Sequence, residues 1–373
     1  MKSGLNALIR EEALRLGFFK IAVVPAGQLP HAWRFARWLG AGMHGEMRYM
    51  ERQADKRKNP AVVLPDVRSI LVLAMNYYTA APRSRGSSTG VISRYAWGED
   101  YHRIVGERLR SLRDFICARS PDAAALHHVD TGPVMEKVWG AESGLGWMGK
   151  HSNLITRERG SWFFIGVILL NVELEYDPPG NNYCGTCVRC LHACPTGAIV
   201  APHVVDARLC ISYLTIEHRG SIPLPLRRLI GNRIFGCDDC QEVCPWNRFA
   251  VEASIDEFRC REENLAPDLA SLVTITGEEF RHRFAGTAIR RVGRNGFVRN
   301  VAVALGNSCP EGAATALSAA ICDSSSLVRA HAAWALGNIG SAEARRLLSD
   351  ARLREADRSV SEEIDLALSA VER

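Results

Sequence analysis

The sequence lacks a long apolar run: its longest, Phe163 to Leu170, spans eight residues, whereas a transmembrane helix needs roughly 20. Met1 to Val24 does not have the pattern of a signal peptide either, because charged residues interrupt apolar positions that recur at helical spacing. It predicts an amphipathic helix. No twin-arginine leader precedes the apolar run. We therefore expect a cytoplasmic protein without membrane contact.

A disulfide framework is also not expected, although the chain has 12 cysteines. The reducing pool of the cytoplasm keeps thiols free, which leaves them available as metal ligands. With 47% hydrophobic and 23% charged residues, the 373-residue chain has the composition of a soluble protein of two or three domains. Its net charge of +5 permits a polyanionic partner without requiring one.

Three regions follow one another along the chain. Short apolar strands at Ile21–Val24, Ile70–Met75 and Phe163–Leu170 alternate with helical patterns, which predicts a layered α/β domain over residues 1–175. A loop rich in proline, glycine and asparagine then opens a cysteine-rich module at residues 176–255. The remainder, residues 265–373, is rich in alanine and leucine and predicts helices.

A repeat is visible in this last region. Val298-Arg299 recurs as Val328-Arg329, and Ala304–Asn307 recurs as Ala335–Asn338, at offsets of 30 and 31 residues. Such a period predicts stacked helical hairpins of the HEAT type, although that class has a somewhat longer repeat of roughly 40 to 47 residues.

The strongest chemical signal is a run of cysteines. Cys184, Cys187, Cys190 and Cys194, followed by Pro195, have the spacing of bacterial ferredoxins, in which three thiolates bind one four-iron cluster and the fourth reaches the next. A regular second copy would place a cysteine where Ile234 stands, so Cys210 is the expected substitute. The predicted ligand groups are Cys184, Cys187, Cys190 and Cys244 for one cluster, and Cys194, Cys210, Cys237 and Cys240 for the other.

Cysteines in such patterns also occur in two other classes of site. Pairs of Cys-x-x-Cys also bind zinc, which leaves two zinc sites as the alternative, but the two Cys-Pro endings favour iron–sulfur clusters. Radical chemistry on S-adenosylmethionine requires a third cysteine after Cys-x3-Cys, and none follows either candidate pair. Two clusters only carry electrons, so we expect the chemistry in the α/β domain.

Four segments outside the cysteines carry a resemblance to a known family. They are Asp55–Pro60, Ser93–His102, Val129–Lys137 and Gly146–Asn153. Together with the cysteine module and the helical tail, they resemble epoxyqueuosine reductases. The resemblance implies a cobalamin bound base-off in the α/β domain, two [4Fe-4S] clusters that reduce it, and an external low-potential electron donor. It further implies reduction of an epoxide on a modified tRNA base, the last step of queuosine biosynthesis.

Within this resemblance, Asp130 is the expected catalytic acid, with a pKa raised by an apolar pocket beside the corrin. From local sequence alone, Asp130 before Thr131-Gly132-Pro133 would be a turn residue. His102 comes close to a motif for histidine ligation of cobalt, but we interpret the match as accidental and His102 as a helix-start residue. The expected cofactor contacts are Arg57, Ser93, Tyr95, Asp130, Lys137, Asn153, Ile155 and Ser212.

Two basic stretches could bind the phosphates of a tRNA. One surrounds a glycine at the start of the repeats, and the other follows Cys210. The predicted tRNA contacts are His218, Arg219, Arg290, Arg291, Arg294, Asn295 and Arg299. In isolation each stretch could be an ordinary solvated helix face.

The sequence and the resemblance together predict a monomeric enzyme of class α/β + α, with a layered α/β cobalamin-binding domain, a two-cluster ferredoxin-like module and HEAT-like helical repeats. One alternative is a ferredoxin-type electron carrier whose helical tail binds a protein. A second is a cobalamin-dependent reductive dehalogenase of small molecules. The absence of an export leader and the arginine-rich tail favour the tRNA enzyme over the dehalogenase.

Overall fold

A computed structural model describes residues 2–83 and 86–371 of the chain. These residues form two units, each assembled from separate stretches. The first contains Met1–Ala80, Gly98–Asp206 and Asp238–Arg259, and the second contains Ala81–Trp97, Ala207–Cys237 and Cys260–Arg373. The cysteine-rich region contributes to both units, and the division into three consecutive regions, 1–175, 176–255 and 265–373, stays a prediction.

A four-stranded sheet organises the first unit. Its strand order is β1 (Lys20–Pro25), β2 (Ser69–Asn76), β7 (Phe163–Leu170) and β4 (Ala125–His128), and every neighbouring pair is antiparallel. Three of these strands confirm the predicted ones. Strand β4 was not predicted, since it is only four residues long and ends in two histidines.

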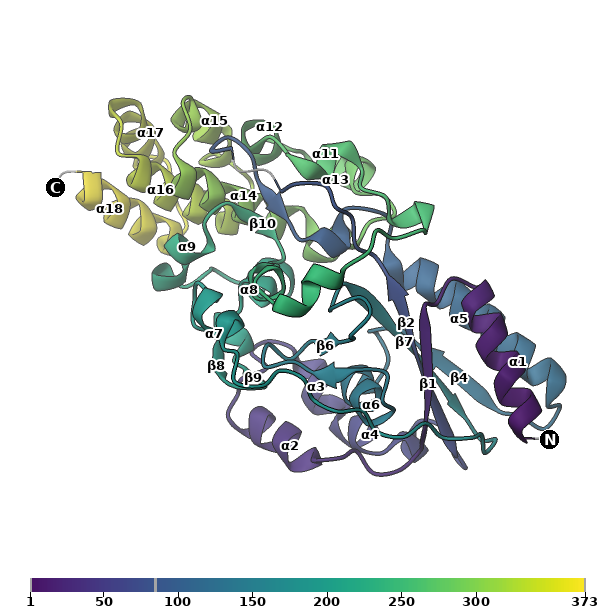
Figure 1. The fold of residues 1–373 in the computed structure, drawn as a ribbon. Helices are drawn as coiled ribbons and strands as arrows, with labels where there is room; N and C mark the ends of the chain where they lie inside the picture. The colour runs from purple at the N-terminus through teal and green to yellow at the C-terminus, as the bar shows by residue number, and fades with distance from the viewer. Residues whose placement is uncertain (1, 84–85, 372–373) are drawn as a thin grey trace. The chain divides into compact units, whose positions relative to one another are not determined.

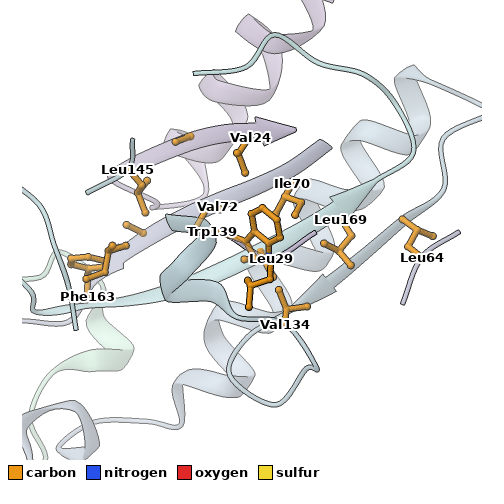
Figure 2. Close-up of a cluster of buried hydrophobic side chains, with 14 residues drawn as sticks. Val24, Leu29, Leu64, Ile70, Val72, Val134, Trp139, Leu145, Phe163 and Leu169 are labelled. Carbon is orange, nitrogen blue, oxygen red and sulfur yellow. The ribbon is translucent and has the colours of Figure 1, made fainter. Parts of the chain in front are cut away.

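Both faces of this sheet are covered, which explains why its central strands are apolar without interruption. Every residue of β2 is buried. Ile70 and Val72 contribute to a hydrophobic cluster around Trp139 of α6 (Glu136–Glu142), as Figure 2 shows. On the opposite face, α5 (Tyr101–Arg119) packs against β4 and β7, and α1 (Lys2–Arg15) lies beside it (Figure 1).

Helix α1 confirms the predicted N-terminal helix but only part of its predicted apolar face, and the helix ends at Arg15, with a strand beginning at Lys20. Ile9 and Ala13 are buried, whereas Leu8 and Leu14 are exposed. Across the described part of the chain, no helix is both long enough and apolar enough to span a bilayer.

The rest of the first unit consists mostly of short helices and two-stranded hairpins. The small hairpins pair β5 (Trp147–Met148) with β6 (Leu154–Ile155) and β8 (Ile199–Ala201) with β9 (Val204–Val205). The helices are α2 (Ala32–Gly40), α3 (Arg48–Arg52), α4 (Ala54–Lys58), α7 (Arg189–Ala193) and α10 (Asp239–Glu242), with 3-10 turns at Pro60–Val62, Pro245–Phe249 and Asp256–Phe258.

One asparagine fixes the stretch that returns to this unit after residue 237. The Asn247 side-chain oxygen accepts a hydrogen bond from the Ser161 backbone N–H at 2.7 Å, and its nitrogen donates to the Gln241 carbonyl at 2.6 Å. Gln241 in turn donates to the Ser161 carbonyl at 3.0 Å. Buried polar groups that satisfy one another in this way hold two distant segments in a single geometry.

The second unit is dominated by stacked helices. Helices α14 (Gly293–Ser308), α16 (Ser326–Ile339) and α18 (Arg358–Val371) pack in succession, with α15 (Ala313–Ala320) and α17 (Ala342–Arg352) beside them (Figure 1). Its other elements are β3 (Val91–Ile92), α8 (Ile211–Ile216), α9 (Leu224–Ile230), β10 (Arg233–Phe235), α11 (Glu262–Leu265), α12 (Leu269–Val273) and α13 (Gly277–Arg283), with 3-10 turns at Arg94–Ala96, Ala207–Leu209 and Ala288–Val292.

The stacking explains the repeated Ala-Leu-Gly-Asn motif. A Cβ atom on Gly306 would lie 2.7 Å from the Ala335 Cα atom, and one on Gly337 would lie 2.8 Å from the Ala367 Cα atom. Each glycine therefore lets its helix approach the next one closely. The following asparagines bind backbone carbonyls: Asn307 donates to Arg227 at 2.8 Å, and Asn338 donates to Gly306.

Replacing Gly306 with alanine should force α14 and α16 apart. We expect the free energy of unfolding to fall by about 1–3 kcal/mol, the usual cost of overpacking, in denaturant unfolding of the intact protein. The control is Gly4→Ala in α1, where a Cβ would meet nothing within 4 Å; this change should be neutral or stabilising because alanine favours a helix. Equal stabilities of the two variants would contradict the close helix contact.

Candidate functional site

The centre of the candidate site is Asp130, on the loop between β4 and α6. Its backbone is left-handed, with φ of 57°, a conformation that aspartate adopts more readily than most residues. The Asp130 Oδ2 atom accepts a hydrogen bond from the Tyr101 hydroxyl at 2.5 Å and lies 3.4 Å from His102 Nε2. The carboxylate therefore faces two polar side chains from the first turn of α5.

The helix start holds these two side chains in place. Asp100 caps α5, since its Oδ1 atom accepts the His102 backbone N–H at 3.0 Å and lies 2.7 Å from His102 Nδ1. The Tyr101 ring stacks on Phe164 of β7, with centroids 4.3 Å apart and an angle of 5°. The prediction that His102 is a helix-start residue is confirmed, but its position beside Asp130 was not anticipated.

The predicted rise in the pKa of Asp130 is wrong for this structure. Partial desolvation of the carboxyl favours its protonated form, but His102, the Tyr101 hydroxyl and the charge of Lys137 outweigh this effect and lower the pKa of Asp130 to about 2. For His102, burial is outweighed by Asp100 and Asp130, which raise its pKa to about 9. At neutral pH the proton of this group therefore resides on His102. The Asp130 side chain is 66% exposed, so solvent screens the pair.

The carboxyl group with a raised pKa is Glu136, in the first turn of α6. Burial and the negative charge of Asp130 raise the pKa of Glu136 to about 7. Its Oε1 atom is buried, and no residue within the described ranges hydrogen-bonds to it. Sequence reasoning missed Glu136, because a glutamate at a helix N-terminus is ordinary capping chemistry.

Several predicted cofactor residues lie near Asp130 in the first unit. Lys137 Nζ donates to Asn153 Oδ1 at 2.7 Å. Arg57 is buried, and its Nη1 atom donates to the Val134 carbonyl at 3.2 Å. Ile155 is fully buried in β6. The structure thus gathers the Arg57, Lys137 and Asn153 side chains around the segments that flank Asp130.

Two buried donors in this region lack a protein acceptor. His151 Nδ1 accepts the Asn153 backbone N–H at 3.1 Å, and burial lowers the pKa of His151 to about 4, so the neutral ring carries its proton on Nε2. His151 Nε2 and Arg57 Nε are both buried without a hydrogen-bond partner among residues 2–83 and 86–371. A cofactor whose edge carries amide and phosphate oxygens would provide the acceptors that these two donors lack.

The other predicted cofactor residues belong to the second unit. The Ser93 backbone N–H donates to the Phe235 carbonyl at 2.8 Å, and the Tyr95 ring lies 6.1 Å from the Phe235 ring. Ser212 Oγ is 3.4 Å from the Cys237 carbonyl. These three residues therefore gather around the end of β10, and the predicted cofactor set is divided between the two units.

The first predicted cysteine group comes together within one unit. Burial raises the pKa of Cys190, and the neighbouring Cys184 and Cys244 raise it further. Burial likewise raises the pKa of Cys244, with Cys184 and Cys187 adding to the effect. In the described part of the chain, no three Cys, His, Asp or Glu residues are placed to hold a single metal ion. The thiols of Cys184, Cys187, Cys190 and Cys244 lie close enough to one another to interact electrostatically.

The second predicted group is divided. Cys194 and Cys240 belong to the first unit, and Cys210 and Cys237 belong to the second. Cys194 Sγ accepts the Ala198 backbone N–H at 3.2 Å, a contact of the kind that tunes cluster potentials. The joint ligation of one cluster by these four residues stays a prediction.

A lysine ties the first cysteine loop to the site. Lys150 Nζ donates to the carbonyls of Gly185 at 2.8 Å and Cys187 at 2.9 Å. Nearby, the Trp147 ring packs against Tyr183 and Trp246, with centroids 5.1 and 4.9 Å away. Lys150 directly precedes His151, so the segment 147–153 reaches both the cysteines and the surroundings of Asp130. We assigned Lys150 no role from the sequence, although it lies in a segment that carried the resemblance.

In the second unit, the two predicted basic stretches meet. Arg219 Nη1 donates to the Val292 carbonyl at 2.9 Å, and Arg291 pairs with Glu217 at 2.5 Å. Arg219, Arg290, Arg291 and Asn295 are exposed, and His218 is half-buried. Arg294 is mostly buried in an ion pair with Asp323 at 2.6 Å. The basic surface, defined here as His218, Arg219, Arg290, Arg291 and Asn295, is thus built from both stretches.

The prediction that Arg299 contacts tRNA directly requires correction, because this side chain has no exposed surface. Its guanidinium donates to the carbonyls of Leu214, His218 and Gly220 at 2.6 to 2.8 Å. His331 supports the same loop, since its Nε2 atom accepts the Ile222 backbone N–H at 3.1 Å. Arg299 therefore shapes the loop that carries part of the basic surface. The burial of Arg299 could not be predicted from the sequence, because a run of arginines does not indicate which of them is buried.

Known families match three parts of the sequence. The family model described as epoxyqueuosine reductase QueG matches residues 57–131, a 4Fe-4S double cluster binding domain matches residues 183–247, and HEAT repeats match residues 298–369. The epoxyqueuosine reductase of Xanthomonas campestris pv. campestris is 41% identical over 340 residues, covering 90% of this chain and 96% of the relative. This chain belongs to the epoxyqueuosine reductase family. The double-cluster match confirms the predicted iron–sulfur module over the zinc alternative, and the HEAT match confirms the predicted repeats.

Other members of the family are also similar in sequence or structure. The epoxyqueuosine reductase of Escherichia coli (strain K12) is 41% identical over 304 residues, 80% of each chain. The crystal structure of an epoxyqueuosine reductase with an epoxyqueuosine-modified tRNA-Tyr stem loop matches all of both chains, with a TM-score of 0.94 at 31% identity. The structure of the Streptococcus thermophilus enzyme matches 99% of both chains, with a TM-score of 0.87 at 26% identity.

Replacing Cys244 with serine should remove a ligand of the first cysteine group and with it one cluster. We expect the iron content of anaerobically prepared protein to fall from about eight atoms per chain to about four, with a matching loss of cluster absorbance. The control is Cys260→Ser, because burial raises the pKa of the Cys260 thiol to about 12 and the residue lies outside the cysteine pattern. An unchanged iron content in the Cys244 variant would contradict its assignment as a ligand.

Proposed function

We propose that this chain reduces epoxyqueuosine to queuosine in tRNA, the last step of queuosine biosynthesis. The observation that carries the proposal is the match of the whole chain, at a TM-score of 0.94, to an epoxyqueuosine reductase crystallised with an epoxyqueuosine-modified tRNA stem loop. An electron carrier would not need the Asp130 site, and a dehalogenase of small molecules would not need the basic surface. The family match therefore favours the tRNA enzyme over both alternatives.

The reaction consumes two electrons and two protons: the epoxide oxygen leaves as water, and a carbon–carbon double bond remains. An external low-potential donor supplies the electrons, and two [4Fe-4S] clusters pass them on one at a time. In our proposal Cys184, Cys187, Cys190 and Cys244 hold one cluster, and Cys194, Cys210, Cys237 and Cys240 hold the other. Clusters of this kind move single electrons only, so a further redox group is required at the epoxide.

In this proposal that group is cobalamin, bound base-off, which when reduced supplies a nucleophilic metal centre for opening the epoxide. The residues that would hold it are the predicted contacts Arg57, Ser93, Tyr95, Asp130, Lys137, Asn153, Ile155 and Ser212. The support within the first unit is the pair of orphaned donors, His151 Nε2 and Arg57 Nε, because each needs an acceptor from outside the described protein.

Asp130 is the proposed catalytic acid, which delivers a proton to the departing epoxide oxygen. The polar side chains around it, Tyr101 and His102, fix the orientation of the carboxylate. Because its pKa of about 2 leaves Asp130 ionised at neutral pH, the carboxylate must receive a proton before it can give one.

The basic surface is the proposed tRNA contact. Arginine side chains bind phosphates with two donors and stack on unpaired bases. Arg299 and His331 stabilise this surface indirectly, because both form hydrogen bonds with the backbone of the segment 214–222. We further propose that the enzyme is cytoplasmic and monomeric, and that residues 1–175, 176–255 and 265–373 serve as cobalamin-binding, cluster-binding and tRNA-binding regions.

The test of this function is nucleoside analysis after anaerobic incubation of reconstituted protein with cobalamin, a low-potential reductant and epoxyqueuosine-containing tRNA. We expect queuosine, one oxygen lighter than the starting nucleoside. The Asp130→Asn variant should keep its iron and cofactor but convert about 10²–10⁴-fold more slowly, the usual contribution of a positioned acid. Unchanged nucleosides with the wild-type protein would refute the function, and full activity of the variant would remove Asp130 from its role.

The tRNA contact has a separate test. Replacing Arg290 with glutamine should weaken tRNA binding at every salt concentration and reduce the slope of log affinity against log salt by about one for the lost phosphate contact. Filter binding or fluorescence anisotropy measures both quantities. Arg358→Gln is the matched control, because Arg358 is 92% exposed on α18 of the same unit, outside the basic surface. Equal effects of the two changes would argue against the basic surface as the binding site.

A further inference from the structure

We propose that His102 is the proton reservoir of the reaction: it protonates Asp130 in each turnover and is reprotonated from solvent. This inference rests on the proposed function and deepens it, since it assigns a source to the proton that Asp130 delivers. His102 acts through Asp130, so it is a positioning and proton-supplying residue, not one that touches the substrate.

The geometry places one imidazole between two carboxylates. His102 Nδ1 lies 2.7 Å from Asp100 Oδ1, and its Nε2 atom lies 3.4 Å from Asp130 Oδ2. With a proton on each ring nitrogen, the imidazolium can donate to Asp100 and face Asp130 at the same time. The distance to Asp130 is that of an ion pair that needs only a small approach to become a hydrogen bond.

The ring is held rigidly enough for this role. It is the second residue of α5, and its backbone N–H donates to the same Asp100 carboxylate that binds its side chain. The Tyr101 and His102 rings lie 4.0 Å apart, and Tyr101 is itself stacked on Phe164. Both Tyr101 and His102 approach the Oδ2 atom of Asp130. Oδ2 is therefore the oxygen that receives the proton from His102 and delivers it to the departing oxygen.

The charges around His102 and Asp130 determine which of these two side chains carries the proton. His102 faces Asp100 and Asp130, both negative; Asp130 also faces Tyr101 from α5 and Lys137 from α6, and its charge acts on Glu136. Two carboxylates against one imidazole favour the imidazolium. A carboxyl with a pKa of about 2 is itself protonated in only about one molecule in 10⁵ at pH 7. Asp130 is therefore a relay and not a store.

The proton transfer balances without any further reactant. The N–H bond of His102 breaks as an O–H bond forms on Asp130; that O–H bond then breaks as one forms on the departing oxygen. His102 becomes neutral, Asp130 is ionised again, and solvent returns a proton to His102. The same sequence can deliver the second proton that completes the water molecule.

The experiment is a pH profile of single-turnover conversion, measured with reduced, cofactor-loaded protein and excess epoxyqueuosine-containing tRNA stem loop. For the wild type we expect a rate that is constant near neutrality and falls as the pH rises through about 9, because His102 then loses its proton. His102→Gln should slow conversion about 10²-fold or more and abolish this alkaline limb.

The decisive variant is Asp100→Asn, because asparagine caps a helix as well as aspartate does and should leave α5 intact. Removing the charge of Asp100 should move the alkaline limb to lower pH by about one unit or more. His127→Gln is the control, because His127 lies on β4 and its charged neighbours are Arg110, Arg113 and Asp114; this variant should keep the wild-type profile. Iron content, cofactor content and tRNA affinity should not differ among the variants.

The outcomes separate this inference from the function on which it rests. If the wild type converts no epoxyqueuosine at any pH, the proposed function fails and the inference with it. A second outcome is that the wild type is active while Asp100→Asn shows the alkaline limb at the wild-type pH and His102→Gln still shows that limb. In that case only the inference fails. Loss of the limb in Glu136→Gln, with the limb retained in His102→Gln, would overturn it in favour of Glu136 as the proton source.

Discussion

The account depends on one interaction, the attachment of the first cysteine loop to the candidate site through Lys150. The ammonium group binds two carbonyls of that loop, those of Gly185 and Cys187. A lysine beside two backbone carbonyls gains two charge-assisted hydrogen bonds, which are stronger than neutral ones. The same segment continues through His151 to Asn153, so Lys150 links the first cysteine group to the residues around Asp130 within the first unit.

The proton side of the site is organised by charge rather than by an apolar pocket. A carboxylate alone in a hydrophobic pocket stays protonated, whereas here His102 and Tyr101 hold Asp130 as an anion. The carboxyl with the raised pKa is instead Glu136, in the first turn of α6. Such a group separates the storage of a proton from its delivery.

Local patterns predicted the parts of the fold that local physics determines. Three of the four strands of the sheet were predicted because an uninterrupted apolar run needs burial on both faces, and the cysteine module was predicted because a cluster fixes the spacing of its ligands. The predicted direction of the Asp130 pKa shift was wrong, because no residue near Asp130 in the sequence reveals that His102 packs against it. The prediction that Arg299 contacts tRNA was wrong for a similar reason: its burial under the loop at His218 arises from packing between distant segments.

The central claim is tested most directly by replacing Lys150 with methionine, which keeps the length of the side chain but removes both hydrogen bonds. The measurement is single-turnover conversion of epoxyqueuosine-containing tRNA by anaerobically reduced protein, with iron content determined on the same sample. We expect the iron of both clusters to be retained and conversion to fall about a hundredfold, the penalty for slight misplacement of a reacting assembly. Wild-type conversion in this variant would contradict the account.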